Sequence, residues 1–506
     1  MTRPQQGPPE AATAEGVVRG RWWRGLRAWR GIPYAAPPTG ALRFRAPEPV
    51  TPWAGVREAA AFGPAAPQRR VRRAAEDCLT LNVLAPAAEA ARPRPVLVFV
   101  HGGGYTGGSS AQPLYGGERL VREGDLVYVS INYRLGALGY FDFREFSTPG
   151  APFEDNPGLR DQLAALEWVR RNIAAFGGDP DRVTLAGQSA GGNAVTTLMC
   201  VPRARGLFHR ALAQSPPAAS AYGVERAQGW ARQFLRILGR DLGDEAVARC
   251  EPTAAARALR EAPAGALVAA AHELTTRNVD AEPGSRATAP VFGTGLLPAH
   301  PLDAFAAGAT HPVPLLIGTT AAEGRLFPLV FDVIPTSRAR IEGMFAATGA
   351  DVRDRILAAY PGWPGRRAAV ELGGDVVFWE PALRCAEGHA RHSPVFVYRY
   401  DFAPRLLRLA GLGATHGTEL LAVFGAADTP AGRAATALGG RAALRAVTRD
   451  VQRHWSAFAR EGHPGPEWPA YAPPARNVLV IDARPRLAHD PGASRRAAWG
   501  DYEHHR

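Results

Sequence analysis

The chain has 506 residues, and its proportions of hydrophobic residues (46%) and charged residues (21%) are typical of a globular protein and exclude a disordered or fibrous one. Its net charge of +12 comes from arginine alone, and the densest cluster, at 69–73, contains no aromatic residue on which a nucleic-acid base could stack. We therefore expect this cluster to be an exposed loop, and we expect no nucleic-acid partner.

We expect no targeting signal in the N-terminal segment. Residues 1–14 are rich in Pro, Gln and Ala without periodicity, which predicts a disordered tail. The first 30 residues lack the apolar core of a signal peptide, and no later stretch has the uncharged apolar length of a membrane span. We expect a cytoplasmic protein without a membrane partner.

Two continuous apolar runs, 95–100 and 126–133, predict strands that are buried on both faces, as in a largely parallel sheet. Leucines recur at helical spacing over 158–177, which predicts a helix. Residues 182–187 form a third predicted strand, and a run of small residues follows it at once as the start of a helix.

After about residue 220 the pattern changes to amphipathic pieces rich in Ala and Arg, such as the predicted helix 230–239. Further strands are predicted at 312–318, 393–402 and 477–482. The alternation of strands and helices indicates the α/β class. We expect one domain over 15–506, with a mostly parallel sheet flanked by helices and a long helical insertion over the active site.

The cysteines at 78, 200, 250 and 385 are too few and too scattered for a disulfide framework or a zinc site. We interpret them as free thiols that are mostly buried, and we predict no metal site.

The segment GQSAG at 187–191 contains the candidate nucleophile, Ser189. A five-residue motif of this kind occurs by chance, but here it lies between a predicted strand and a predicted helix. In such a nucleophile elbow the serine occupies a strained turn, and flanking glycines allow a substrate carbonyl to approach.

Acyl transfer also needs N–H donors for the negative oxygen of the tetrahedral intermediate. HGGGY at 101–105 directly follows a buried strand and exposes successive backbone amides. We assign Gly103 and Gly104 as donors, together with the N–H of Ala190. The alternative is a plain glycine-rich turn, which the preceding strand and the elbow disfavour.

An activated serine requires a base. Among thirteen histidines, His416 stands out because it lies in a loop beside Gly417, whereas His392 and His454 are expected on the surface.

The base in turn needs an acid that fixes its tautomer. Glu323 follows the predicted strand 312–318, and catalytic acids in open α/β sheets lie at the carboxyl ends of strands. Glu323 could equally serve as a first-turn carboxylate of the next helix, and the two roles are compatible.

The combination of motifs resembles the type B carboxylesterases, which include cholinesterases and bacterial p-nitrobenzyl esterases. The resemblance extends from about residue 16 to the C-terminus and rests on EDCLTLNV (76–83), HGGGY (101–105), NYRLGALGYF (132–141), FGGDPDRVTLAGQSAGG (176–192) and THGTELLAVFG (415–425). It implies an α/β-hydrolase fold, Ser189 as nucleophile, His416 as base and Glu323 as acid. It also implies oxyanion donors at Gly103, Gly104 and Ala190.

Four features depart from the family pattern. Gln188 replaces the glutamate that usually precedes the serine, which removes a negative charge. Cys78 has no earlier cysteine with which to close the disulfide loop of secreted relatives, and 62–78 has no counterpart of the choline-binding tryptophan. Pro216 replaces a glycine, with no effect that the sequence reveals.

These observations predict a serine carboxylesterase that hydrolyses small neutral esters through an acyl-enzyme on Ser189, without metal or cofactor. An amidase or carbamate hydrolase with the same triad is the alternative. A non-catalytic binding relative is disfavoured, because such proteins lose a triad member and this chain keeps all three. The sequence does not indicate the oligomeric state.

Overall fold

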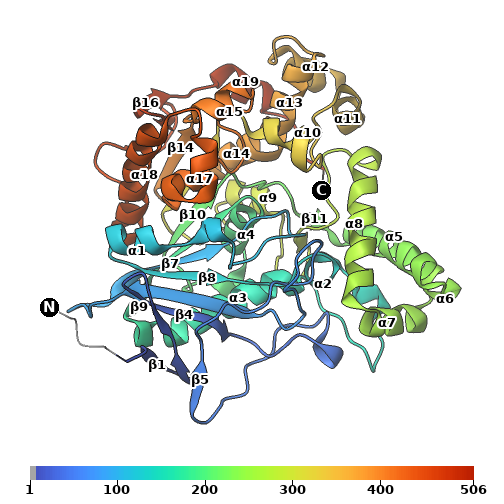
Figure 1. Cartoon of the computed structure of the whole chain (residues 1–506). Coiled ribbons are helices and arrows are strands. Elements are labelled where there is room, and N and C mark those ends of the chain that lie inside the picture. The colour runs from blue at the N-terminus through green and yellow to red at the C-terminus, as the bar shows by residue number, and fades with distance from the viewer. Residues whose placement is uncertain (1–6, 506) are drawn as a thin grey trace.

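A large twisted sheet forms the centre of the computed structural model, which describes residues 7–505 (Figure 1). Within these residues the sheet has eleven strands in the order β16-β15-β14-β13-β10-β9-β7-β8-β6-β4-β3. The seven strands from β15 to β8 are parallel to one another, and antiparallel strands complete both edges. The mostly parallel sheet confirms the predicted fold class.

The predicted strands form the middle of this sheet. They appear as β7 (Arg94–Val100), β8 (Val127–Ile131), β9 (Gly178–Gln188), β13 (Leu315–Thr320), β14 (Val395–Tyr400) and β15 (Asn477–Ile481). The strand β10 (Arg210–Gln214) lies between β9 and β13. All residues of β7 and β8 are buried, as expected for strands covered on both faces.

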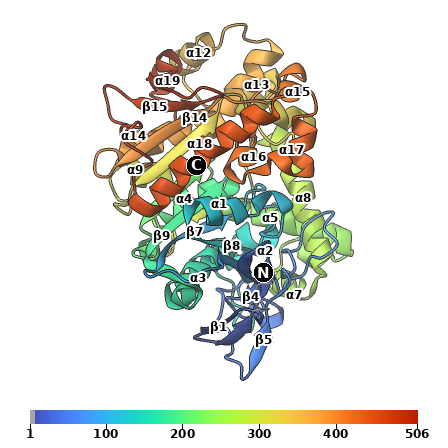
Figure 2. The same ribbon diagram turned by 60° about the vertical axis from the view of Figure 1, so that its left-hand side comes forward.

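Alternate strand residues divide the core into two layers. Val96, Val98 and Val100 pack with one set of helices and Leu97 and Phe99 with another. The first layer contains α3 (Pro157–Asn172), α4 (Ala190–Leu198), α9 (Pro301–Ala306) and α14 (Glu380–His389). The second contains α1 (Glu118–Gly124), α16 (Leu420–Val423) and α18 (Arg441–Glu461). Figure 2 shows α18 and α1 on the side of the sheet opposite α3.

The chain after residue 220 forms two helical groups with small cores of their own. The first consists of α5 (Val224–Leu242), α6 (Glu245–Ala248), α7 (Pro252–Glu261) and α8 (Ala264–Ala281), and the second of α11 (Arg338–Met344), α12 (Ala350–Ala358), α13 (Arg366–Gly374) and α19 (Ala493–Trp499). The predicted helix 230–239 is therefore the middle of α5.

The prediction of a disordered tail over 1–14 is wrong for its last part, and residues 1–6 lie outside the described range. Residues Glu10–Thr13 form β1, which pairs with β2 (Gly16–Arg19). Ala11 is buried, and Glu10 forms an ion pair with Arg19. Backbone pairing and one small side chain thus order a segment whose composition has no strand pattern.

Several side-chain predictions have clear outcomes. The arginines of 69–73 are exposed, and Cys78, Cys200 and Cys385 are buried, as predicted. His454 is buried on α18, where Nδ1 contacts the carbonyl oxygen of Pro464 at 2.7 Å, so its prediction as a surface residue is wrong. None of the helices between residues 7 and 505 is both long and apolar enough to cross a bilayer.

Candidate active site

Ser189 lies at the sharp turn between β9 and α4. Its backbone has φ 58° and ψ −125°, a conformation that a non-glycine residue adopts only under strain. Two hydrogen bonds hold this turn: Ser189 N donates to the carbonyl of Gln214 on β10, at 2.9 Å, and Asn193 N donates to the carbonyl of Ser189, at 2.8 Å. The geometry is that of the predicted nucleophile elbow.

The glycines of the motif are required by close packing. A Cβ on Gly191 would lie 2.0 Å from the carbonyl oxygen of Val100, and a Cβ on Gly187 would lie 2.2 Å from that of Gly191. Any side chain at these positions would push α4 away from β7 and β9. The first turn of α4 therefore approaches the strand ends closely enough to point its free N–H groups at the site.

Glu323 and His416 meet beyond the carboxyl end of β13. Glu323 begins a 3₁₀ helix (Glu323–Leu326), and its Oε2 lies 2.5 Å from Nδ1 of His416. The loop that carries His416 is fixed to this helix, because Ala322 N donates to Ala414 O and Leu326 N donates to Thr415 Oγ1, both at 3.0 Å. The predicted first-turn position of Glu323 thus coexists with its contact to histidine.

Every group that faces the Glu323 carboxylate is a donor. Its Oε1 accepts hydrogen bonds from the Ser215 hydroxyl and from Thr320 N, both at 2.6 Å. Glu323 is buried, and a carboxylate accepts hydrogen bonds without donating any. The proton of His416 consequently belongs on Nδ1, facing Glu323, and Nε2 is left as an acceptor.

His416 Nε2 lies on the side of the nucleophile. It is 3.2 Å from Nε2 of Gln188, the residue that precedes Ser189. The rings of Phe378 and Phe327 pack against the imidazole with centroid distances of 4.4 and 5.3 Å. These rings exclude water from the imidazole and fix its orientation.

The glycine-rich loop after β7 borders Ser189. A Cβ on Gly102 would lie 3.1 Å from Cβ of Ser189, so the loop passes directly beside the nucleophile. Gly103 and Gly104 have φ 119° and 62°, and their N–H groups donate to no acceptor within residues 7–505. The loop is tied to α4, because the Tyr105 hydroxyl donates to Asn193 Oδ1 at 2.6 Å. The alternative of a plain turn does not explain two free amides beside a serine.

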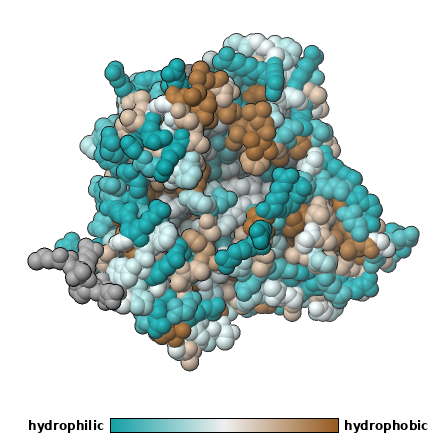
Figure 3. Space-filling model, viewed as in Figure 1, coloured by the Kyte–Doolittle hydropathy of each residue, from teal (hydrophilic) through white to brown (hydrophobic). Residues whose placement is uncertain are grey.

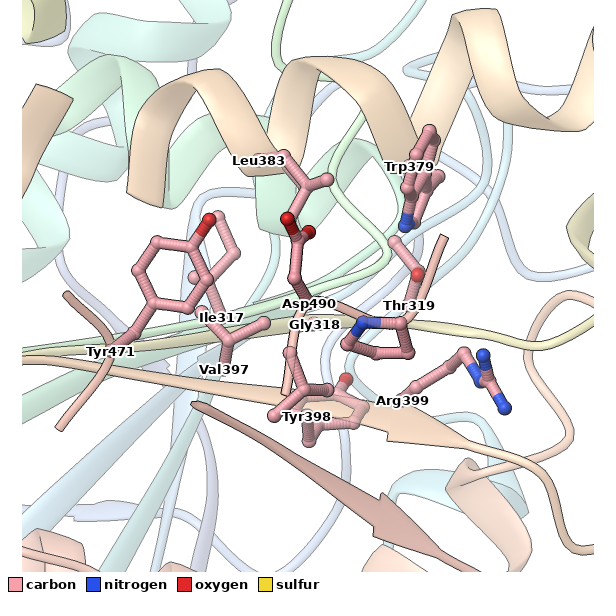
Figure 4. A pocket seen from close by; sticks show the side chains of 13 residues that line it. Ile317, Gly318, Thr319, Trp379, Leu383, Val397, Tyr398, Arg399, Tyr471 and Asp490 are labelled. Carbon is pink, nitrogen blue, oxygen red and sulfur yellow. The ribbon is translucent and has the colours of Figure 1, made fainter. Parts of the chain in front are cut away.

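The structure thus brings the six predicted residues to one edge of the sheet. Figure 3 shows one face of the molecule, viewed as in Figure 1, with a depression near its middle. A separate small pocket lies between α14 and the strands β13 and β14, and its lining residues, among them Trp379, Arg399 and Asp490, include none of the six (Figure 4).

Four neighbours of the site escaped the sequence analysis. Ser215 and Thr320 stand at the ends of β10 and β13, Arg286 follows α8, and Glu419 lies one turn beyond His416. Burial raises the pKa of Glu419 to about 8, and the charge of Glu323 adds to this effect. A signal existed for Ser215, because it directly follows a short segment rich in alanine and leucine that forms β10. No local pattern marks Arg286.

Comparisons with known proteins agree on one family. The profile of the carboxylesterase family matches residues 7–499. The para-nitrobenzyl esterase of Bacillus subtilis (strain 168) is 34% identical over 496 residues, which cover 96% of this chain and 97% of that protein. The phenmedipham hydrolase of Pseudarthrobacter oxydans is also 34% identical, over 95% of this chain and 97% of that protein.

Solved structures of similar proteins superimpose over nearly the whole chain. A PNB esterase structure, 34% identical, has a TM-score of 0.85 and covers 97% of this chain and 99% of its own. The carboxylesterase EST55 of Geobacillus stearothermophilus, 33% identical, has a TM-score of 0.83 with the same coverage.

Proposed function

We propose that this chain, which belongs to the carboxylesterase family and is a carboxylic ester hydrolase of the α/β-hydrolase fold, acts through an acyl-enzyme on Ser189. His416 is the base and Glu323 the acid in this proposal. The observation that carries it is the contact of 2.5 Å between Glu323 Oε2 and His416 Nδ1. It makes Nε2, which lies 3.2 Å from the Gln188 amide nitrogen, the ring nitrogen that accepts a proton.

The first half of the reaction forms the acyl-enzyme. His416 Nε2 takes the proton of the Ser189 hydroxyl as Oγ attacks the ester carbonyl, and the resulting oxyanion accepts hydrogen bonds from the N–H groups of Gly103, Gly104 and Ala190. Glu323 stabilises the imidazolium that forms. His416 then donates the proton to the departing alcohol.

The second half releases the acid. A water molecule loses a proton to His416 Nε2 and attacks the acyl carbon, and Ser189 Oγ recovers the proton as the carboxylic acid leaves.

We further propose that neutral esters are preferred over cationic ones. Gln188 places an uncharged amide beside the nucleophile, 3.2 Å from His416 Nε2. A carboxylate at this position would attract a cationic substrate, and its absence removes that attraction.

Carbamate hydrolysis is the second candidate, and one observation favours it. A relative that is 34% identical over 95% of this chain is named for the hydrolysis of phenmedipham, a carbamate. The same nucleophile and oxyanion donors would serve both reactions, because the leaving group is selected by the shape of the pocket.

The test of the mechanism is Ser189→Ala. We expect the kcat for p-nitrophenyl butyrate to fall by about 10⁴-fold or more, the size of effect seen when a triad serine is removed. The matched control is Ser393→Ala, in a loop before β14 at the opposite edge of the sheet. Retention of wild-type turnover by Ser189→Ala would overturn the proposal.

The test of substrate charge is Gln188→Glu. We expect the ratio of kcat/KM for butyrylcholine to that for butyl butyrate to rise roughly tenfold, as a carboxylate a few ångströms from a bound cation implies. An unchanged ratio would refute the charge argument without affecting the assignment of Ser189.

A further inference from the structure

Arg286 reaches the glycine-rich loop from the segment that follows α8. Its Nη2 donates to the carbonyl oxygen of Gly104 at 3.2 Å, and the Thr288 hydroxyl donates to the same oxygen at 3.3 Å. A Cβ on Gly104 would lie 2.4 Å from Nη2. The guanidinium therefore touches the residue whose N–H is a proposed oxyanion donor.

Within the described residues, no carboxylate forms an ion pair with this guanidinium. The Arg286 side chain is half-buried, and burial lowers its pKa, opposed only by the hydroxyls of Tyr222 and Tyr105. A guanidinium carries five N–H donors, and the single acceptor that it contacts here is the Gly104 carbonyl. None of its nitrogens is both buried and unpaired, so the remaining N–H groups of this half-buried guanidinium are accessible to an anionic ligand.

A cluster of further arginines lies on the side of the glycine-rich loop. Gln68, next to the arginine cluster at 69–73, exchanges two hydrogen bonds with Gly108 of the glycine-rich loop, at 2.8 and 2.9 Å. The four arginines of the cluster are exposed, and none forms an ion pair with a carboxylate between residues 7 and 505; Arg69 instead contacts His272 on α8. Together with the neutral Gln188, they make this side of the site positive.

We propose that Arg286 binds the carboxylate of an ester substrate, so that the enzyme prefers esters carrying a second, anionic carboxylate group over neutral esters of similar size. This inference rests on the proposed esterase activity of Ser189 and adds the substrate class. It extends the proposed preference against cationic esters. Gln188 lacks the negative charge that would attract a cationic substrate, and Arg286 attracts an anionic one.

Gly104 links the two proposed sites. Its N–H is a proposed oxyanion donor, and its carbonyl oxygen accepts a hydrogen bond from Arg286. A carboxylate a few bonds from the ester group would therefore reach Arg286 and could form two parallel N–H···O bonds. Half-esters of short dicarboxylic acids have this geometry.

The kinetic test compares monomethyl glutarate with methyl pentanoate in wild type, Arg286→Met and Arg286→Lys, with acid release followed by titration. We expect wild type to show the higher kcat/KM for the anionic ester. In Arg286→Met the ratio of kcat/KM for the anionic ester to that for the neutral ester should fall about ten- to a hundredfold, as expected when a hydrogen bond between charged groups is lost. Arg286→Lys should restore part of the ratio because it keeps the charge.

The matched control is Arg391→Met. Arg391 also donates to a single carbonyl, that of Ala306 at 3.2 Å, but it lies before β14 at the opposite edge of the sheet. Its replacement should leave the ratio at the wild-type value.

A binding measurement separates this inference from the chemistry of Ser189. Titration calorimetry with Ser189→Ala should detect binding of monomethyl glutarate. The affinity for this ester should fall about tenfold or more in the double variant Ser189→Ala/Arg286→Met. An unchanged ratio and unchanged affinity, or an equal loss for both esters, would overturn the inference; the equal loss would make Arg286 a positioning residue for the oxyanion loop. Full turnover by Ser189→Ala would instead refute the proposed mechanism.

Discussion

Glu323→Gln changes one oxygen of a fully bonded carboxylate into an amide nitrogen. In the wild type three donors face this group: the Ser215 hydroxyl, Thr320 N and His416 Nδ1. The backbone N–H of Thr320 cannot become an acceptor, so the glutamine must point its oxygen there. Its NH₂ group then faces His416 Nδ1, which has to give up its proton, and the proton moves to Nε2.

This tautomer cannot accept a proton from Ser189. The analogous substitution in an unrelated serine protease, in which Asn replaces the catalytic Asp, lowers kcat about 10⁴-fold for this reason. This loss corresponds to an increase of about 5.4 kcal/mol in the activation free energy. We expect a loss of this size for p-nitrophenyl butyrate at neutral pH, with KM nearly unchanged because no substrate contact is altered. Steady-state kinetics on protein with a wild-type melting temperature is the assay. A fall of less than about tenfold would refute the reasoning.

Two further predictions concern neighbours of the acid. Ser215→Ala removes the hydroxyl that donates to Glu323 Oε1 at 2.6 Å; since Thr320 N and His416 remain, kcat should fall only about tenfold, and a loss as large as that of Glu323→Gln would show that Ser215 alone fixes the carboxylate. Burial raises the pKa of Glu419 from 4.5 to about 8, so the folded protein holds a proton that the unfolded chain releases, and the free energy of unfolding should decline between these pH values. Glu419→Gln has no such proton, and its melting temperature should fall less than that of wild type across this window; equal slopes in calorimetry would contradict a buried neutral Glu419.

The central sheet was predictable because its strands carry their own signal. β7 and β8 are buried on both faces, and apart from Arg94 and Ser130 they consist of aliphatic, proline and aromatic residues, without the polar alternation of a half-exposed strand. The strand β1 has no such signal: of its four residues only Ala11 is buried, and its order comes from pairing with β2. Edge strands stabilised by a partner cannot be recognised from their composition.

The site divides in the same way. Ser189, Gly103 and Gly104 lie in short glycine-containing motifs. Close backbone approach requires some of these glycines: a Cβ on Gly191, for example, would lie 2.0 Å from the carbonyl oxygen of Val100. Such motifs can therefore be recognised in the sequence. Arg286 is brought to Gly104 only by the packing of the insertion, and nothing near it in the chain indicates this. His454 is the converse case. This polar residue is buried on α18 because the carbonyl of Pro464 supplies a hydrogen-bond partner that the local sequence does not reveal.

The charges around Ser189 match the charge separation that ester cleavage creates. In the proposed mechanism a negative oxyanion forms at the glycine-rich loop that Arg286 contacts, while a positive imidazolium forms on His416 beside Glu323. Glu419, held neutral by burial, adds no second negative charge next to Glu323 below about pH 8. An anionic substrate group at the oxyanion side would offset part of the positive field that stabilises the transition state, unless a dedicated cation pairs with it. Arg286 can do so because its guanidinium has donors to spare, whereas the oxyanion donors are backbone amides that stay available to the reacting carbonyl.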